Sequence, residues 1–313
     1  MKTILITGVA GNIGSALAQA LLKRDDYYIV GVDNLVTGSL TKLPKFSDRF
    51  HFIKADVNNY QEISTIFLSR QFDYVFHFAA LVGVQRTLNN PLLVLDDIDG
   101  VRNILSLSKN SIVSRVFFSS SSEVYGEPVT LPQHEETTPL NSKLPYAIVK
   151  NLAEAYFRSY FDEHGLSYTI FRFFNTYGPN QSEDFVVPRF LKKALQNEPL
   201  QINGDGSQTR TFCYIDDNID TIIRCLEKDS YINDVLNIGS DIEYTIKKLA
   251  EIVLKISNSN STIEYLPPLK EGDMTRRKPD ISKMKSVLSR DLLPIEIGIK
   301  KLIDYYSKAD KDG

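Results

Sequence analysis

The sequence lacks tryptophan and contains only two cysteines, Cys213 and Cys225, among its 313 residues. Two cysteines cannot form the disulfide framework of a small secreted domain or a zinc cluster of four thiolates. The four histidines are scattered along the chain without metal-ligand spacing, so we expect no metal site. These absences favour a reducing compartment, and we predict a cytoplasmic protein.

Long apolar runs and a strong excess of one charge are also missing. No stretch is long and apolar enough to span a bilayer, and the first residues are typical of a strand rather than a signal peptide. The formal net charge of −3 provides no basic surface of the kind that binds nucleic acid. Because 42% of the residues are hydrophobic and 24% are charged, we expect a globular protein with a large core. We therefore predict neither a membrane partner nor a nucleic-acid partner.

A glycine-rich turn follows the first apolar segment of the chain. The segment Lys2–Thr7 is typical of a short buried strand, and Ile13–Lys23 is rich in alanine and leucine and predicts a helix. A strand, a glycine turn and a helix are the context in which a backbone approaches a pyrophosphate and a helix N-terminus binds it. The residues predicted to contact this dinucleotide are Gly8, Gly11, Asn12, Ile13 and Gly14.

A carboxylate follows the second predicted strand. Asp33 lies 19 residues after Gly14, which is the place of the acidic residue that binds the adenosine ribose in dinucleotide sites. A carboxylate at this place repels a 2′-phosphate, so we expect NAD rather than NADP as the cofactor. Further cofactor contacts are predicted at Asn34, Asp56, Val57, Phe78, Ala79 and Ala80.

Strand-like and helix-like segments alternate through the first half of the chain. The predicted strands are Thr3–Thr7, Tyr28–Val32, Phe50–Lys54, Tyr74–His77, Val116–Ser119 and Ser167–Phe173. The predicted helices are Ser15–Lys23, Gln61–Ser69, Leu92–Lys109 and Pro145–His164. This alternation predicts an α/β fold, a doubly wound parallel sheet of the Rossmann type with helices on both faces.

The sequence changes character after Asn175, where proline and glycine become more frequent and the segments shorter. Helices are predicted near Val187–Gln196, Asp216–Lys228 and Ile246–Ile256. We therefore expect two domains. Residues 1–174 would form an NAD-binding Rossmann domain, and residues 175–313 a smaller α/β substrate-binding lobe, some of whose segments return to the Rossmann sheet.

Polar side chains cluster where the predicted strands end. In an open parallel sheet, ligands bind beyond the carboxyl ends of the strands. The serine run Ser119–Ser122 follows the fifth strand and can supply a hydroxyl to a reacting oxygen. The residues at the ends of the other strands are Gly8, Asp33, Asp56, Val57, His77–Ala80 and Asn175.

Tyr146 and Lys150 open a predicted helix. A spacing of four places both side chains on one helix face, one turn apart. Tyrosine, with a pKa of about 10, is a poor base at neutral pH, but a nearby ammonium group favours the phenolate and lowers that pKa. The pair is therefore suited to take a proton from a substrate hydroxyl.

In these motifs the sequence resembles the extended short-chain dehydrogenase/reductase family, specifically the branch that acts on nucleotide sugars. The resemblance spans nearly the whole chain, and the order and spacing of its motifs are very specific. The matching segments are Thr7–Gly14, Asp33, Asp56–Val57, His77–Ala80, Ser119–Gly126, Tyr146–Lys150, Arg172–Pro179, Gly204–Arg210 and Arg276–Asp280.

The resemblance implies a first step shared by the family, in which NAD⁺ accepts a hydride from C4 of the sugar. It implies that Tyr146 is the base for the C4 hydroxyl, that Lys150 lowers the pKa of Tyr146 and holds the nicotinamide ribose, and that Ser121 hydrogen-bonds the C4 oxygen. The substrate would be a nucleotide-diphospho-sugar. The residues implied to bind it, besides Ser121, are Asn175 at the diphosphate, Arg210 and Arg277 at phosphate, and Val187.

The net reaction depends on the residues beside this set. The family's 4,6-dehydratases carry Asp-Glu where this chain has Ser122-Glu123, so the resemblance disfavours dehydration. The Ser-Glu pair and the segment around Arg277 are similar to the uronate decarboxylases, although other decarboxylase signatures are incomplete. C4 epimerases also fit the scaffold. We therefore expect net epimerisation or decarboxylation, with catalytic roles for Ser122 and Glu123.

Two alternatives stay open. The enzyme could stop after oxidation, release a 4-keto nucleotide sugar and need a separate oxidant for NADH. The chain could instead bind NAD(H) as a non-catalytic sensor, although the intact set of Ser121, Tyr146 and Lys150 argues against this.

Two further expectations come from the resemblance. The family often has asparagine where this chain has Asp97, which puts the usual asparagine-linked proton relay in doubt; Asp97 could instead bond the backbone or a water. The family also pairs subunits through two long helices. The segments Leu92–Lys109 and Pro145–His164 could do the same, so we predict a homodimer or a tetramer built from it.

Overall fold

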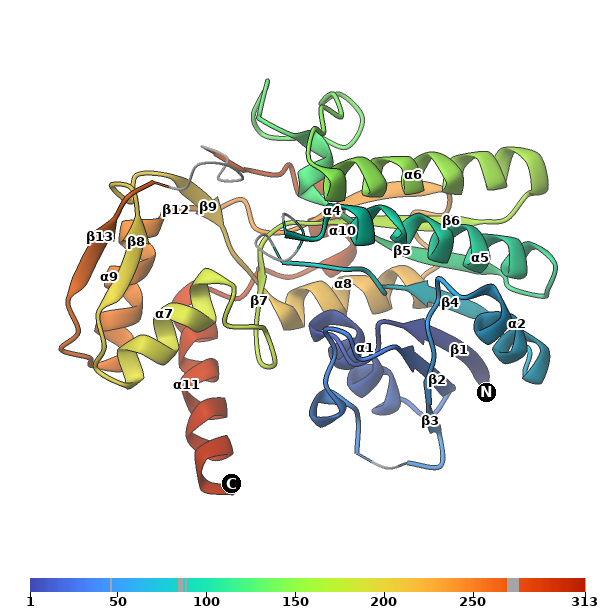
Figure 1. Cartoon of the computed structure of the whole chain (residues 1–313), viewed down its shortest axis with the longest axis horizontal. Coiled ribbons are helices and arrows are strands. Elements are labelled where there is room, and N and C mark those ends of the chain that lie inside the picture. The colour runs from blue at the N-terminus through green and yellow to red at the C-terminus, as the bar shows by residue number, and fades with distance from the viewer. Residues whose placement is uncertain (46, 84–86, 88, 269–275, 313) are drawn as a thin grey trace. The chain divides into compact units, whose positions relative to one another are not determined.

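The computed structural model (Figure 1) describes residues 1–45, 47–83, 87, 89–268 and 276–312. The chain divides into two units. Unit 1 comprises Met1–Gly126, Leu140–Phe173 and Ile219–Leu236. Unit 2 comprises Glu127–Pro139, Phe174–Asn218 and Asn237–Gly313. The chain thus passes between the units several times.

A seven-stranded sheet forms the centre of unit 1, in the order β11-β6-β5-β4-β1-β2-β3. Neighbouring strands from β3 to β6 run parallel. The order reverses beside β1, where β2 lies on one side and β4 on the other, and this is the switch point at which such sheets bind ligands. The strands are β1 (Lys2–Thr7), β2 (Tyr27–Asp33), β3 (Phe50–Lys54), β4 (Tyr74–His77), β5 (Arg115–Ser121), β6 (Tyr168–Phe173) and β11 (Asp234–Ile238).

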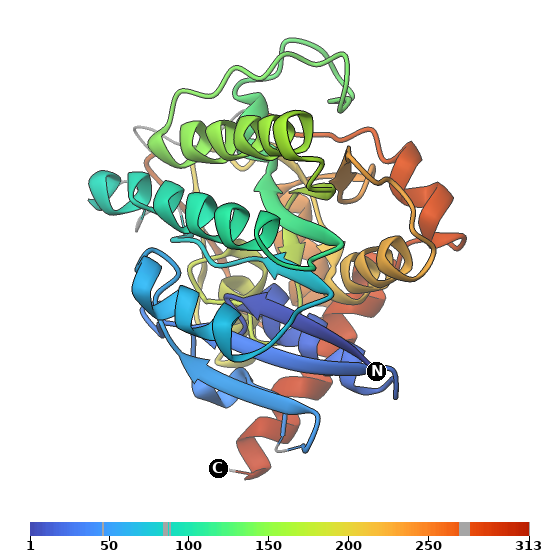
Figure 2. The same ribbon diagram turned by 90° about the vertical axis from the view of Figure 1, so that its right-hand side faces the viewer.

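Helices cover both faces of this sheet. Figure 2 shows α2, α5 and α6 stacked along one face, where their apolar side chains share one buried cluster with the strands. On the other face lie α1 and α8 (Figure 1), and an ion pair of 2.6 Å joins Arg24, which follows α1, to Glu227 at the end of α8. The helices are α1 (Asn12–Leu22), α2 (Tyr60–Ser69), α4 (Pro91–Leu95), α5 (Asp97–Lys109), α6 (Pro145–His164) and α8 (Ile215–Glu227).

Aromatic and β-branched side chains hold the central strands in register. The rings of Phe76 and Phe117 stack with centroids 4.3 Å apart, and Phe117 stacks on Phe171 at 6.0 Å. These residues lie on β4, β5 and β6, and the pairs Phe76–Phe117 and Phe117–Thr169 set their register. Such cross-strand pairs stabilise a sheet beyond simple burial. The carboxyl ends of the strands are thereby fixed at one edge.

The predicted fold class is confirmed, with two differences. The predicted helix Leu92–Lys109 is divided into α4 and α5 at Asp96, which ends the first helix and begins the second. The acidic residues of the first turn of α5 favour a new helix start because they complement its positive N-terminal dipole. The strand β11, late in the chain, was not predicted by its residues, although later segments were expected to return to the sheet; its pairing with β6 is non-local and leaves no signal in spacing.

Unit 2 contains short strand pairs and helices. The strands pair as β10 with β7, β12 with β9, and β13 with β8. They are β7 (Thr176–Tyr177), β8 (Leu200–Asn203), β9 (Thr209–Thr211), β10 (Cys213–Tyr214), β12 (Glu243–Thr245) and β13 (Ile263–Leu266). The helices are α7 (Val186–Leu195), α9 (Ile246–Ser257), α10 (Ser282–Leu288) and α11 (Ile295–Asp312). Across both units, none of the described helices combines the length and apolar composition needed to cross a bilayer.

Candidate active site

The glycine turn after β1 is packed too tightly for side chains. Gly8 has φ +72°, and a Cβ there would lie 2.6 Å from the backbone nitrogen of Ala79. A Cβ on Gly14 would lie 2.3 Å from the carbonyl oxygen of Gly8. The helix α1 starts at Asn12, after Gly11, and no side chain caps it. Its first N–H groups therefore point out of the turn toward any bound anion.

Asp33 connects this turn to the end of β2. Its Oδ2 accepts a hydrogen bond of 3.0 Å from the backbone of Ala10, and its Oδ1 accepts one of 2.8 Å from Leu35. The side chain is buried, with 8% exposure. Each carboxylate oxygen can accept a second bond, so Asp33 can hold ribose hydroxyls while it fixes the turn.

The end of β4 lies next to the glycine turn, and the end of β3 lies beside that of β2. Thr7 accepts hydrogen bonds through Oγ1 from the backbone of Phe78 (3.2 Å) and Ala79 (3.3 Å). On the other side of the switch point, Asn34 donates to Asp56 at 3.2 Å. The side chain of Val57 is buried. The predicted cofactor residues, including Ile13 in α1 and Ala80 after β4, thus occur along one sheet edge.

Tyr146 and Lys150 lie in the first turns of α6, which begins at Pro145. The ammonium nitrogen of Lys150 donates to the carbonyl oxygen of Ser119 at 2.7 Å and lies 5.9 Å from the centroid of the Tyr146 ring. Lys150 is 4% exposed. Burial lowers the pKa of Lys150 to about 8, although Asp97 and Glu154 act in the opposite direction. The structure therefore brings the predicted pair to the end of β5.

Asp97 bonds the backbone, as expected for its departure from the family pattern. Its Oδ2 accepts a hydrogen bond of 2.8 Å from Leu81. Burial raises the pKa of Asp97, and the bond from Leu81 and the charge of Lys150 partly offset this. His77, at the end of β4, is buried, and burial followed by the charge of Lys150 lowers its pKa to about 3. His77 is therefore neutral at physiological pH.

The serine run ends in a tight turn, Ser122–Tyr125, capped by Ser121. The Oγ of Ser121 accepts a hydrogen bond of 3.2 Å from the backbone of Glu123. A hydroxyl that accepts one bond can still donate its own hydrogen, so Ser121 can serve a substrate oxygen. Ser122 is buried, with 2% exposure, so it does not face solvent.

A buried ion pair beneath this turn was not predicted from the sequence. The carboxylate of Glu154 accepts two hydrogen bonds from Arg172, at 2.9 and 2.7 Å, and one from Ser120 at 2.6 Å. Arg172 also donates to the hydroxyl of Tyr125 at 2.8 Å. Burial alone would raise the pKa of Glu154, but the bonds and charge of Arg172 lower it overall. The only local signal was that Glu154 follows Lys150 by one helical turn.

The predicted substrate residues Asn175, Val187, Arg210 and Arg277 belong to unit 2. Arg210 and Arg277 are 9% and 7% exposed, and a β-bridge joins the residues that precede them, Thr209 and Arg276. Asn175 donates its side-chain amide to Thr211 at 3.0 Å.

Val187, a predicted substrate residue, lies at the start of the helix α7. Val187 is 2% exposed, so its side chain packs in the interior of unit 2. Val187 lies in the first turn of α7, which has no side-chain cap. This helix therefore presents backbone N–H groups of the kind that bind phosphate.

A comparison with known families defines the class of protein. The model described as "NAD dependent epimerase/dehydratase family" matches residues 4–239. The chain belongs to this family, whose members are NAD-dependent enzymes of the extended short-chain dehydrogenase/reductase type. This confirms the predicted family and enzyme class.

Within this family, the chain is similar to enzymes that act on UDP-linked uronic acids. A UDP-N-acetyl-alpha-D-glucosaminuronate decarboxylase of Bacillus cytotoxicus is 34% identical over 99% of this chain and 99% of its own length. A UDP-glucuronate 4-epimerase of Thermodesulfobacterium geofontis is 34% identical over 97% of this chain and 96% of its own. The crystal structure of UDP-glucuronic acid 4-epimerase from Bacillus cereus, in complex with UDP-glucuronic acid and NAD, has a TM-score of 0.89 and 31% identity, and the match covers 98% of this chain and 99% of that one.

The buried ammonium of Lys150 predicts a pH-dependent stability cost. Its pKa falls from 10.5 to about 8 on folding, so between these values the unfolded state binds more protons and stability rises with pH. Below pH 8 the cost is fully present and corresponds to at most about 3 kcal/mol. Urea denaturation of cofactor-free protein should therefore show Lys150→Met more stable than wild type at pH 7, by about 1–3 kcal/mol.

The gap between Lys150→Met and wild type should close as the pH rises from 8 to 10.5. The matched control is Lys54→Met on β3, where the lysine is exposed and the substitution should leave the pH dependence unchanged. A Lys150→Met protein that is less stable than wild type at pH 7 would contradict a desolvated ammonium.

Proposed function

We propose that the protein is an NAD-dependent UDP-uronate decarboxylase that oxidises C4 of the sugar and then releases the C6 carboxylate as CO₂. The observation that carries this is the turn Ser121-Ser122-Glu123 at the end of β5, the strand on which Lys150, one helical turn from Tyr146, bonds Ser119. The relatives named above support UDP as the nucleotide and a uronic acid as the sugar.

The residues after β1 fit NAD. A cradle that excludes any Cβ at Gly8 and Gly14 lets the backbone approach a pyrophosphate, and the uncapped start of α1 offers it N–H groups. Asp33 would accept the ribose hydroxyls and disfavour a 2′-phosphate. When bound, NAD⁺ supplies the hydride acceptor that the side chains lack.

Proton transfer falls to Tyr146. As the phenolate, Tyr146 would take the proton of the C4 hydroxyl while C4 gives up a hydride, and the charge of Lys150 favours that phenolate. Ser121 donates a hydrogen bond to the C4 oxygen. The buried pair Glu154–Arg172 keeps Ser120 and Tyr125 in place on either side of this turn.

Oxidation at C4 makes the sugar a β-keto acid, because the carboxylate on C5 then lies β to the ketone. The C5–C6 bond breaks and CO₂ leaves. The electron pair of that bond moves toward the C4 oxygen and forms an enolate, which Ser121 and the protonated Tyr146 can stabilise. C5 would then be protonated, with water as the net source of that proton, and the C4 alcohol would be re-formed when the hydride returns to C4 and Tyr146 returns its proton to the C4 oxygen. The backbone N–H of Glu123 donates to Ser121 and ties this residue to the serine turn, and we assign its carboxylate to these later steps.

Substrate binding would rely on unit 2. The buried guanidinium groups of Arg210 and Arg277 and the uncapped N-terminus of α7 are suited to a diphosphate. Asn175 would contact the same group. We assign unit 1 as the cofactor-binding domain and unit 2 as the substrate-binding lobe.

A UDP-uronate 4-epimerase is the second candidate. It requires the same oxidation by Tyr146 but returns the hydride to the opposite face of the sugar without loss of carbon. The similarity to two UDP-glucuronate 4-epimerases favours it.

One incubation separates these functions. Purified enzyme is incubated with UDP-glucuronate and with UDP-N-acetylglucosaminuronate, and the products are analysed by mass spectrometry. Loss of CO₂ supports decarboxylation, and a product of unchanged mass but altered C4 configuration supports epimerisation. Loss of only two hydrogens would instead identify net oxidation, and no turnover of either compound would contradict both candidates.

Glu123→Gln distinguishes the steps within the reaction. If Glu123 acts after oxidation, the variant should still reduce NAD⁺ in a single turnover while CO₂ release falls by about 10²-fold, as for loss of an acid–base group. The matched control is Glu127→Gln, an exposed carboxylate slightly later in the sequence, which should match wild type. Equal CO₂ release by Glu123→Gln and wild type would show that this carboxylate has no part in the reaction.

Tyr146→Phe removes only the phenolic oxygen. The variant should keep its fold and its cofactor but lose about 10²–10⁴-fold in kcat, because the C4 proton has no acceptor. Steady-state turnover and the content of released NAD(H) are measured together. Turnover within a few-fold of wild type would remove Tyr146 from the role of base.

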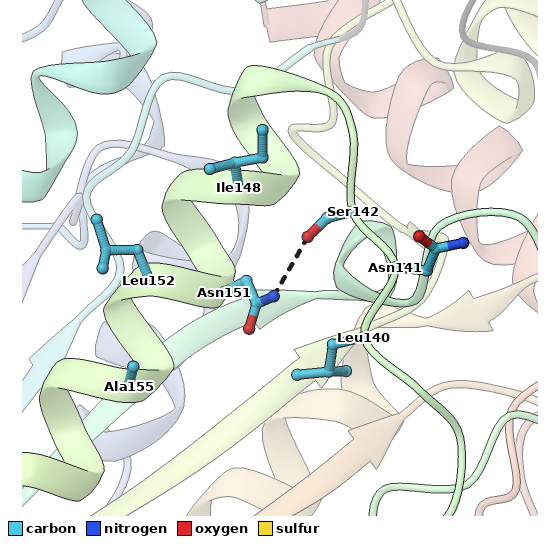
Figure 3. A pocket seen from close by; sticks show the side chains of 7 residues that line it. All are labelled: Leu140, Asn141, Ser142, Ile148, Asn151, Leu152 and Ala155. Atoms are coloured by element: carbon cyan, nitrogen blue, oxygen red, sulfur yellow. Dashed lines mark hydrogen bonds between the residues drawn. The ribbon is translucent and has the colours of Figure 1, made fainter.

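Self-association is part of the proposal, through an apolar surface on α4 and α6. Five large apolar side chains, 39–76% exposed, form what we call the α4/α6 face: Leu92, Leu93, Leu95, Ile148 and Leu152. A hollow of about 420 Å³ lies beside α6 (Figure 3), where Asn151 donates to Ser142 at 3.4 Å. An exposed patch of this kind is typical of an interface, and we assign it to a homodimer.

Both cysteines are buried and form no disulfide, which is typical of proteins of the cytoplasm.

Substitutions that place carboxylates on the α4/α6 face test this assignment. Wild type should have the mass of two chains by light scattering after size exclusion, and Leu92→Glu with Leu152→Glu should give the mass of one. Leu68→Glu is the matched control, because Leu68 is an apolar residue of 87% exposure on α2. A monomeric wild type, or a double variant that stays dimeric, would exclude this face as the interface.

A further inference from the structure

One carboxylate of unit 2 bonds to both segments that carry the predicted phosphate-binding arginines. Glu243, on β12, accepts two hydrogen bonds from Arg276: 2.6 Å from Nε to Oε1 and 2.7 Å from a terminal nitrogen to Oε2. The hydroxyl of Thr209, on β9, donates to Oε1 at 3.2 Å. The ammonium of Lys278 lies 3.5 Å from Oε2. The side chain of Glu243 is only 17% exposed, so these bonds are partly shielded from water.

Two partners of Glu243 are the immediate neighbours of buried arginines. Thr209 precedes Arg210, and Arg276 precedes Arg277. The backbones of Thr209 and Arg276 are also joined by a parallel β-bridge, and β9 pairs with β12 so that Arg210 lies opposite Tyr244. The side chain of Glu243 therefore reinforces, across three segments, the place where two buried guanidinium groups are attached.

The arginines of this region differ in their burial and in their hydrogen bonds. Arg276, half exposed, is paired with the carboxylate by two bonds that occupy its planar fork. Arg210 and Arg277 are buried, with exposures of 9% and 7%. A terminal nitrogen of Arg210 donates to the backbone carbonyl oxygen of Thr209 at 2.8 Å. The residue whose hydroxyl bonds Glu243 thus also orients the guanidinium group of Arg210.

We propose that Glu243 is a positioning residue for the nucleotide diphosphate, because it fixes the segments of Arg210 and Arg277 relative to each other through Thr209 and Arg276. This inference rests on the proposed function, in which those two arginines bind the diphosphate. Glu243 does not touch the ligand and takes no part in proton transfer. Its effect is to hold the two guanidinium groups in the arrangement that binds one anion before that anion is bound.

Positioning and simple electrostatics predict opposite results when Glu243 loses its charge. Removing a negative charge and releasing Arg276 and Lys278 makes the region more positive, which alone would tighten the binding of an anion. Loss of the bonds that fix Thr209 and Arg276 lets the two arginine segments move, and the cost of ordering them is then added to binding. The direction of the change in affinity therefore decides between the two effects.

The test uses the full-length enzyme saturated with NAD and UDP as the probe. Glu243→Gln should raise the Kd for UDP, measured by calorimetry, by at least about 5-fold, and raise KM for the sugar substrate by a similar factor. The value of kcat and the bound NAD should stay within about twofold of wild type. Arg276→Lys keeps the positive charge but cannot bond both oxygens at once, so it should weaken UDP binding in the same direction.

The matched control is Glu227→Gln in unit 1, where a surface carboxylate also bonds an arginine, Arg24, at 2.6 Å. This variant should bind UDP as wild type does. UDP binding by Glu243→Gln that equals or exceeds wild type would overturn the positioning role while leaving the proposed function intact. Failure of wild type itself to bind UDP would contradict the proposed function, and the positioning role would fall with it.

Discussion

The site depends on a positive charge held almost out of water. The ammonium of Lys150 is 4% exposed, and it donates a hydrogen bond to the carbonyl oxygen of Ser119. A desolvated ammonium loses hydration, so its protonated form is less favourable than in water. The same desolvation strengthens its effect on a phenol one helical turn away. In the proposed mechanism, the stability that the fold gives up at Lys150 is coupled to the reactivity of Tyr146.

The surrounding charges make such an arrangement tolerable. Glu154, one turn further along α6, is neutralised by Arg172 through two hydrogen bonds and does not need Lys150 as its partner. Asp97 is held by the backbone of Leu81 and supports the charge of Lys150 from a second helix. A buried pair with all its hydrogen bonds made gives rigidity more than net stability. Here that rigidity fixes the strand end that carries the serine turn.

Local patterns in the sequence were sufficient to predict the parallel sheet, the glycine turn and the pair on α6, because each depends on spacing within one strand or helix. The contacts between elements could not be predicted. The partnership of Glu154 with Arg172 joins α6 to β6, and β11 pairs with β6 across a long separation in sequence. The break at Asp96 was missed because helical periodicity continues through it, whereas the fold favours a second helix start there.

The pH dependence of hydride transfer tests the coupling between Lys150 and Tyr146 most directly. Single-turnover reduction of bound NAD⁺ by the sugar nucleotide is followed by absorbance across the pH range in wild type and in Lys150→Met. If the buried ammonium promotes ionisation of the phenol, the wild-type rate should rise with pH and level off near neutral pH. In the variant, the pH at which the rate levels off should be higher by more than about one unit. Superimposable profiles for the two proteins would contradict that coupling.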